Sequence, residues 1–285
     1  MSTQKKPVYS GIHTFLGLPN QRDLKNVDAA FYGMPFDIGV TNRPGCRFGP
    51  QCIREVGECA NYHEELDINI FDDFSAVDTG DFDIPISYID ADMTAVTDQL
   101  LDLLNQDVIT IGIGGDHTLA YPELMAVKEK YGRVAFVHFD SHTDTWDWPG
   151  EDGQCLINHG TPFRCAIQHD CLDMDHAIQV GMRGGLFTPE DHAWALSQGM
   201  KIIPANELHD MGVMECAKRI RETVGDMPVF VTFDIDFLDP AVAPGTGTPV
   251  CGGFTTDEAL KLLRGALTGL NIVAMDLVEV APCYD

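Results

Sequence analysis

The stretch Val134-Ala-Phe-Val-His-Phe-Asp-Ser-His-Thr-Asp144 joins an apolar run to three side chains of the kinds that bind metals. The run predicts a buried strand, because short apolar runs rich in β-branched and aromatic residues are typical of strands covered on both faces. Alternate side chains of an extended segment point the same way, so Asp140, His142 and Asp144 can converge on one point. We therefore predict a metal site at the end of this strand and expect other strand ends to complete it.

The rest of the chain alternates strands with helices. Predicted strands cover residues 27–34, 68–82, 107–113, 134–139, 177–182, 201–203, 229–235 and 271–280. Predicted helices cover residues 51–60, 89–104, 119–130, 188–198, 208–224 and 255–270, with Ser87 as one N-cap and a Thr255/Glu258 capping box at the last helix. The continuous apolar strands predict a parallel sheet covered on both faces. We expect one three-layer α/β/α domain over residues 1–285.

The bulk composition limits the classes of partner. The chain has 285 residues and a formal net charge of −26, which argues against nucleic acid and anionic membranes and is compatible with a cationic substrate. A well-solvated or salt-adapted surface is the main explanation for most of that charge. The nine cysteines form no CxxC pair, which indicates free thiols in a reducing compartment. With no signal-type segment and no apolar run of about 18 residues, we expect a cytoplasmic protein without a membrane span.

Four predicted strands end in polar side chains of the kinds that bind metal ions. They lead into Gly114-Gly-Asp-His117, Asp140-Ser-His-Thr-Asp144, Asp234-Ile-Asp236 and Asp276-Leu-Val-Glu279. Each motif alone is compatible with an ordinary turn. Together they would bury several carboxylates and imidazoles where the carboxyl ends of parallel strands meet, and such burial needs compensating charge. Two divalent cations supply that charge, so the pattern predicts a dinuclear metal site.

The ligand types indicate which metal is bound. Two imidazoles and four carboxylates form a hard, oxygen-rich set, and no cysteine lies in the four motifs. This set favours Mn²⁺ over Zn²⁺, with Ni²⁺, Fe²⁺ or Co²⁺ as alternatives. We expect two Mn²⁺ ions per subunit.

These motifs resemble those of the ureohydrolase family, which includes arginases and agmatinases. The resemblance rests on Pro44-Gly-Cys-Arg-Phe-Gly-Pro50, Gly114-Gly-Asp-His117, Asp140-Ser-His-Thr-Asp144, Thr232-Phe-Asp-Ile-Asp-Phe-Leu-Asp-Pro240, Pro244-Gly-Thr-Gly-Thr-Pro249 and Met275-Asp-Leu-Val-Glu279. Because the motifs occur in family order from about Gly33 to Glu279, the resemblance covers nearly the whole chain.

The resemblance implies an arginase-type fold with an eight-stranded, mostly parallel sheet, assembled as homotrimers or homohexamers. It implies that His117 binds one manganese ion and His142 the other. The carboxylates that would bind or bridge the ions are Asp140, Asp144 and Asp234, with Asp236 completing the second ion. Family members usually continue past the Glu279 motif into a last helix, whereas this sequence stops at Asp285, and truncation there is one explanation for the difference.

Three side chains are predicted to act in catalysis. Asp144 is expected to accept a hydrogen bond from the attacking hydroxide while it binds metal. His159 is expected to transfer a proton, because histidine titrates near neutrality; its alternative role is to stabilise its loop. Glu279 is expected to bind the guanidinium through a bidentate, charge-assisted hydrogen bond. His138 and Asp276 are expected to lie behind the ligands, and Arg183 to have a structural role.

The loop between Asp144 and His159 is expected to form the wall of the substrate pocket. It lacks the Asn/Ser/Thr-rich segment with which arginases hold an amino acid head group, and residues 159–164 and 179–184 resemble the agmatinase and guanidinobutyrase branch. We therefore predict hydrolysis of agmatine to putrescine and urea. Acidic and aromatic loop residues favour a cationic substrate: Asp147, Glu151, Asp152, Trp146 and Trp148. The alternative is a guanidino acid such as guanidinobutyrate or guanidinopropionate, whose carboxylate would meet Arg43 or Arg164.

Two other classes of protein share parts of this pattern. A non-catalytic regulatory relative would have lost a metal ligand or His159, and all of these residues are present. A dinuclear phosphoesterase would have more histidine ligands and basic residues for phosphate, which this acidic chain does not offer.

Overall fold

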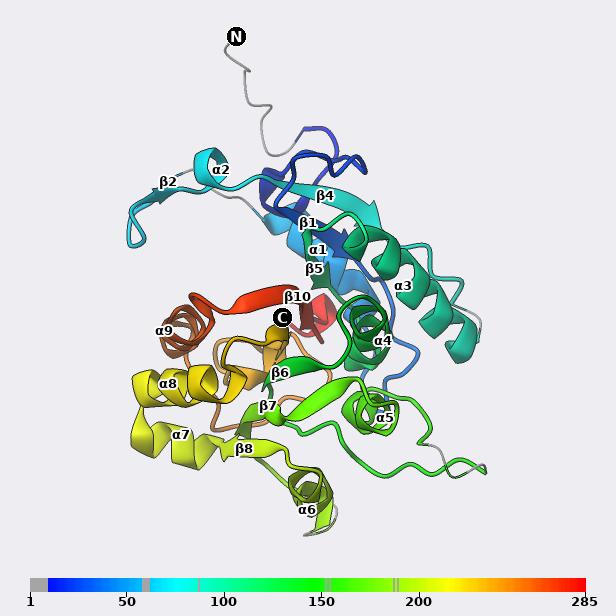
Figure 1. Cartoon of the computed structure of the whole chain (residues 1–285), viewed down its shortest axis with the longest axis vertical. Coiled ribbons are helices and arrows are strands. Elements are labelled where there is room, and N and C mark those ends of the chain that lie inside the picture. Colours follow the sequence, from blue (N-terminus) through cyan, green and yellow to red (C-terminus); the bar gives the residue numbers. More distant parts are fainter. Residues whose placement is uncertain are drawn as a thin grey trace.

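The computed structural model describes residues 10–57, 62–86, 88–151, 153, 155–186, 188 and 190–285. In this part of the chain an eight-stranded sheet has the order β4-β1-β5-β10-β9-β6-β7-β8 (Figure 1). The strands are β1 (Ala29–Gly33), β4 (Ala76–Asp81), β5 (Ile109–Ile113), β6 (Val134–Phe139), β7 (Leu172–Met182), β8 (Lys201–Pro204), β9 (Pro228–Asp234) and β10 (Asn271–Val278). Every neighbouring pair is parallel, which confirms the predicted fold class.

Helices cover both faces of the sheet (Figure 1). One face packs against α3 (Ile89–Leu104), α4 (Ala120–Tyr131), α5 (Pro162–Gln168) and α6 (Glu190–Ser197), and the other against α7 (Ala205–Met211), α8 (Val213–Val224) and α9 (Thr256–Leu267). Successive side chains of β6 point to opposite faces of the sheet. Phe136 therefore belongs to the hydrophobic core under α3–α6, and Val137 belongs to the core under α7–α9. Each such fully buried side chain stabilises the fold by about 1.5–3 kcal/mol.

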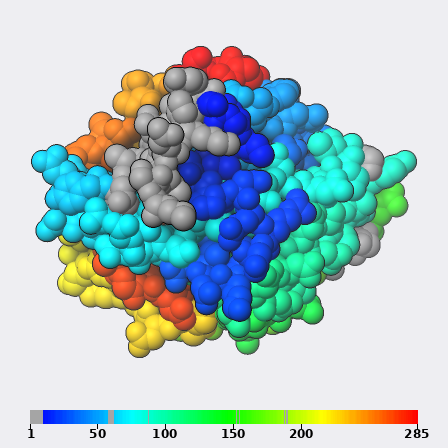
Figure 2. Space-filling model, turned by 90° about the horizontal axis from the view of Figure 1, so that it is seen from above, coloured from blue at the N-terminus to red at the C-terminus, as the bar shows by residue number. Residues whose placement is uncertain are grey.

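The outer edge of β4 is covered by the N-terminal segment before β1, where residues 19–21 lie against Asp78. The Asp78 N–H donates to the carbonyl of Pro19 at 2.9 Å, and the Gln21 N–H donates to the carbonyl of Asp78 at 3.1 Å. Figure 2 shows this segment, in blue, lying against the cyan residues around β4. An uncovered edge strand offers free backbone groups for pairing with another chain, so the N-terminal segment protects this edge.

Arg54 on α1 (Gly49–Val56) ties that helix to the same edge strand. Its Nε and Nη2 lie 2.9 and 3.0 Å from the two carboxylate oxygens of Asp78, which is fully buried, and it also pairs with Asp81. Burial lowers the pKa of Arg54, but its hydrogen bonds to the two carboxylates outweigh burial and raise it. Asp78 therefore depends on Arg54 for its neutralising charge.

Replacing Arg54 with methionine should lower the free energy of unfolding by about 3 kcal/mol, because it leaves the buried Asp78 carboxylate without a counter-ion. Equilibrium unfolding in urea measures this change. The matched control is Arg219→Met on α8, where a half-exposed arginine pairs with Glu207 and Glu215 on the surface, and where a loss below about 1 kcal/mol is expected. Equal unfolding midpoints for the two variants would contradict the structural role of Arg54.

The helices and strands differ from the predicted boundaries at several places. The predicted helix 208–224 is two helices, α7 and α8, because Gly212 lies between them with a φ of 82°. The predicted strand 68–82 is a short strand β3 (Ile68–Asn69), a helical turn α2 (Ile70–Asp73) and then β4. β3 pairs with β2 (Tyr62–His63) in a separate hairpin.

Other boundaries also shift. Helix α1 starts at Gly49 and ends at Val56, while residues 58–60 of the predicted helix lie outside the described residues, as does the predicted N-cap Ser87. The last strand ends at Val278, two residues early. The capping box is confirmed, since the Glu258 N–H donates to Thr255 Oγ1 at 3.3 Å and the Thr255 N–H to Glu258 Oε2 at 2.9 Å. No helix among the described residues is long and apolar enough to cross a membrane.

Candidate active site

The four polar strand ends meet at one edge of the sheet. The strands that carry them, β5, β10, β9 and β6, are consecutive neighbours in the sheet, and all run in the same direction. Parallel strands present their carboxyl ends together, and ligands of such sheets bind at that edge. The sheet order therefore brings together motifs that lie as far apart in the sequence as His117 and Glu279.

Asp140 lies at the centre of the cluster. Its Oδ2 is 3.1 Å from Nδ1 of His117, and its Oδ1 is 3.4 Å from Nδ1 of His142. The other three carboxylates divide between the two imidazoles. Nδ1 of His117 is 2.9 Å from Asp144 and 3.4 Å from Asp234, and Nδ1 of His142 is 3.1 Å from Asp236. All six predicted ligands thus form two groups that share Asp140.

The charge of this cluster fits bound cations. The four carboxylates are nearly inaccessible, with 0–5% relative exposure. Burial, and then the charges of Asp236 and Asp140, raise the pKa of Asp234 well above its usual value. Burial also raises the pKa of Asp236, together with the charge of Asp140. Four crowded carboxylates around two imidazoles need positive charge, and this donor set suits two hard divalent cations that share Asp140.

Polar side chains behind the cluster orient its members. His117 Nε2 lies 2.9 Å from Thr232 Oγ1, and Ser141 Oγ donates to Asp236 at 2.7 Å. His138 Nε2 lies 2.7 Å from Asp140, where we expected a supporting histidine, and is close enough to His117 and Asp140 to share an ion with them. Such partners fix the orientation of metal ligands. No role was predicted for Thr232, although it shares the face of Asp234 by alternation along β9.

Glu279 is fixed by three donors. His159 Nδ1 and the His117 N–H lie 3.1 and 2.9 Å from its Oε1, and Cys46 Sγ donates to its Oε2 at 3.1 Å. Burial raises the pKa of Glu279, but the hydrogen bond and charge of His159 outweigh burial and lower it. Glu279 therefore stays charged. Its φ of 63°, like the φ of 50° at Asp144, is rare for residues other than glycine, and such conformations cluster at functional sites.

His159 is held from both sides of its ring. Nδ1 faces Glu279, while Nε2 lies 3.1 Å from the N–H and 2.7 Å from the hydroxyl of Thr41. Burial lowers the pKa of His159, but the hydrogen bond and charge of Glu279 outweigh burial and raise it to about 9. Thr41 and Cys46 come from the segment after β1. Cys46 lies in the motif Pro44–Pro50 quoted above, but no role was predicted for it, and Thr41 lies in none of the quoted motifs.

A narrow hollow of about 30 Å³ lies above this cluster. It is lined by Thr41, His142, Asp144, Trp146, His159, Gly160, Asp234, Thr248 and Glu279. Trp146 forms one wall and packs closely on Gly160, where a Cβ atom would lie 2.5 Å from the indole. The described lining includes carboxylates but no lysine or arginine.

The two arginines considered as contacts for a substrate carboxylate, Arg43 and Arg164, bind the protein itself, as does Arg183. Arg43 donates to the carbonyls of Thr246 and Gly247, and Arg164 donates to that of Thr145. Arg183 donates to four carbonyls, those of Gly181, Asp236, Leu238 and Val250, in agreement with the structural role we expected. Asp147 and Glu151 do not line the hollow, and Asp152 lies outside the described residues.

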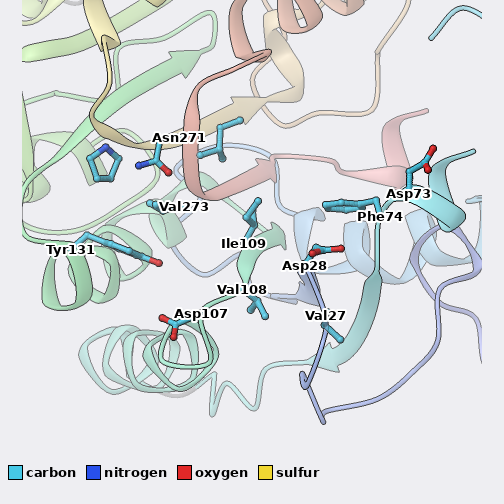
Figure 3. Close-up of a pocket in the computed structure, with 12 residues that line it drawn as sticks. Val27, Asp28, Asp73, Phe74, Asp107, Val108, Ile109, Tyr131, Asn271 and Val273 are labelled. Atoms are coloured by element: carbon cyan, nitrogen blue, oxygen red, sulfur yellow. The ribbon is translucent and has the colours of Figure 1, made fainter. Parts of the chain in front are cut away.

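A larger hollow of about 520 Å³ lies at the opposite edge of the sheet (Figure 3). It is formed by the amino ends of strands, where Asp28 precedes β1, Asp107 precedes β5 and Asn271 begins β10. Its described lining has no imidazole and no thiol. This second hollow therefore lacks the imidazole ligands that the cluster at the carboxyl ends of the strands provides.

Comparisons with known proteins agree with this geometry. The model of the arginase family matches residues 27–285. The chain is 41% identical to "Agmatinase, mitochondrial" of Gallus gallus, covering 96% of this chain and 80% of the relative. It is 39% identical to "Guanidinobutyrase" of Pseudomonas aeruginosa, covering 98% and 88%. The structure of proclavaminate amidino hydrolase from Streptomyces clavuligerus superposes with a TM-score of 0.91 at 38% identity, covering 98% of this chain and 92% of that one. The chain belongs to the arginase family.

Proposed function

We propose that the protein hydrolyses a guanidino compound to urea and an amine, and that agmatine is its substrate. The observation that carries this proposal is the buried, charged Glu279 beside six converging metal-ligand side chains under one narrow hollow. Membership of the arginase family supports the reaction. The assembly we propose is a homotrimer or homohexamer, which light scattering would measure.

We propose that two Mn²⁺ ions share Asp140, with His117, Asp144 and Asp234 around one ion and His142 and Asp236 around the other. Asp144 and Asp234 would bind the ion on the His117 side and could also bridge the two ions. Bound metal ions of this kind lower the pKa of a water molecule from 15.7 towards about 7, which supplies a nucleophile at neutral pH. Ni²⁺ is the alternative that the same ligands accept.

The residues of the chain have separate roles in the proposed reaction. Asp144 accepts a hydrogen bond from the attacking water and so orients it towards the guanidinium carbon. Glu279 binds the planar guanidinium, because a carboxylate that remains charged when buried forms a strong, directional pair with it. His159 holds a proton at neutral pH, since its pKa is raised to about 9, and delivers that proton to the departing amine nitrogen.

The hollow favours agmatine over a guanidino acid. Its described lining has no lysine or arginine to meet the carboxylate of guanidinobutyrate, and burying that carboxylate unpaired would be costly. The protein has a net charge of −26, which attracts a cation, and the indole of Trp146 can face an ammonium group. The relatives named agmatinase and guanidinobutyrase are similarly distant, at 41% and 39% identity. The preference for agmatine therefore rests on the residues that line the hollow.

The test is urea release from agmatine, guanidinobutyrate, guanidinopropionate, arginine and guanidine, by protein loaded with Mn²⁺ or with Ni²⁺. We expect the highest kcat/KM for agmatine, at least about tenfold above guanidinobutyrate, which corresponds to about 1.4 kcal/mol. A higher kcat/KM for guanidinobutyrate would support the guanidino acid alternative. No urea from any of the five compounds with either metal would overturn the proposed reaction.

A further inference from the structure

Two cysteines join the loop of the substrate pocket to the helix behind it. Cys155 lies on the loop between Trp146 and His159, and Cys165 lies on α5. Cys165 Sγ donates to the carbonyl oxygen of Cys155 at 3.5 Å. The Cys155 N–H also donates to Gln168 Oε1 at 3.2 Å. The Cys165 thiol therefore already contacts the backbone of Cys155, and both cysteines are free.

The two thiols differ in access and acidity. Cys155 is half-buried, whereas Cys165 has 3% relative exposure. The neighbouring Cys165 thiol lowers the pKa of Cys155, burial opposes this, and the Trp148 backbone and the Arg164 charge lower it further, to about 7. Accessible thiols of low pKa beside a second cysteine are the ones that oxidants attack. In contrast, burial raises the pKa of Cys171 to about 12.

The segment between these cysteines contains His159. A bond from residue 155 to residue 165 would close a short ring around Asn158-His159-Gly160. Cys155 also touches the pocket wall, since its Sγ lies 3.7 Å from the carbonyl oxygen of Trp146. A disulfide needs the sulfurs about 2.05 Å apart, so its formation would draw this loop towards α5.

We propose that Cys155 and Cys165 are a peroxide-sensitive thiol pair, and that their disulfide lowers activity by shifting the loop that carries Trp146 and His159. The pair is an oxidation site outside the metal cluster, and its formation does not depend on which substrate the enzyme hydrolyses. The change in activity rests on the function proposed above.

The oxidant is a hydroperoxide, here hydrogen peroxide. The Cys155 thiolate attacks one peroxide oxygen, the O–O bond breaks, and Cys155 becomes a sulfenic acid as hydroxide leaves and is protonated to water. The sulfur of Cys165 then attacks the sulfenic sulfur, forming the S–S bond and releasing the second water. Two thiols and one H₂O₂ thus give one disulfide and two H₂O, and a dithiol reverses the change.

Peptide mapping without reductant tests the bond directly. Trypsin cleaves after Arg133, Arg164 and Arg183, so Cys155 and Cys165 fall in separate peptides, 134–164 and 165–183. After treatment of the full-length protein with one equivalent of H₂O₂, we expect these peptides linked, and unlinked after dithiothreitol. The link should persist in Cys171→Ser, which replaces the other buried cysteine of the second peptide. It should be absent from both Cys155→Ser and Cys165→Ser. A link through Cys171, or none in the wild type, would overturn the pairing.

Urea release before and after the same treatment tests the consequence. We expect kcat/KM of the wild type to fall at least about threefold and to recover with dithiothreitol, with no such fall in Cys155→Ser. Cys155→Ser replaces the half-buried thiol, so the test remains possible even when the buried substitution Cys165→Ser prevents folding. Cys251→Ser, which removes an exposed thiol, should respond as the wild type does. A disulfide-linked protein with unchanged kcat/KM would overturn the proposed effect on activity. The peptide map tests the disulfide itself, and its result does not depend on which substrate the enzyme hydrolyses.

Discussion

Replacing Asp140 with alanine should remove both bound metal ions and lower kcat/KM for urea release by at least about 10³-fold. Asp140 offers one oxygen to the His117 side of the cluster and the other to the His142 side, so its loss weakens both sites together. Metal ions contribute several kcal/mol to such reactions, and about 1.4 kcal/mol corresponds to a factor of ten. Metal content by mass spectrometry and urea release measure the two effects.

The control for this variant is Asp102→Ala on the exposed surface of α3, which makes the same chemical change away from the cluster. It should keep two metal ions and the kcat/KM of the wild type. An Asp140→Ala protein that keeps two metal ions per subunit would show that Asp140 does not bridge them. One that keeps one ion would assign Asp140 to a single site.

Replacing Glu279 with glutamine should lower kcat/KM by about 10³-fold while metal content stays unchanged. The substitution keeps the shape of the side chain but removes the charge that pairs with the guanidinium. Charge-assisted hydrogen bonds contribute about 1.5–3 kcal/mol each, so two of them account for a loss of this size. Because the ground state and the transition state both carry the guanidino group, most of this loss should appear as a rise in KM.

A double-mutant cycle with His159→Gln separates the proposed roles. His159 Nδ1 lies 3.1 Å from Glu279 Oε1, and the charge of Glu279 raises the pKa of this histidine. The two substitutions should therefore be non-additive, with a coupling of about 1 kcal/mol or more. Additive losses in kcat/KM would show that Glu279 does not act on the proton of His159.

The strands and the metal-type side chains could be predicted because both depend on short-range patterns. Apolar runs followed by Asp or His identify β5, β6, β9 and β10, and parallel pairing then requires their carboxyl ends to meet. Short elements with weak patterns escaped prediction. α5 spans only Pro162–Gln168, and the first part of β7 carries Asp173 and Asp175, so it does not resemble a buried strand.

Contacts that depend on tertiary packing could not be predicted at all. Thr41 and Cys46 reach His159 and Glu279 from a loop that precedes them by more than a hundred residues. Nothing in the sequence around Thr41 marks it as a partner of a histidine. The same holds for the contact between Cys155 and Cys165, which lie on either side of Gly160, a glycine that packs closely against Trp146.

The place of β10 in the sheet has a consequence for the order of folding. It is the last strand in sequence order among the described residues, yet it lies between β5 and β9 and hydrogen-bonds to both. Until it is in place, the sheet remains two separate pieces, with His117 on one and Asp140 on the other. During synthesis, the active site therefore cannot assemble until residues 271–278 have left the ribosome, and the exposed edges of β5 and β9 make the nascent chain dependent on protection from aggregation until that moment.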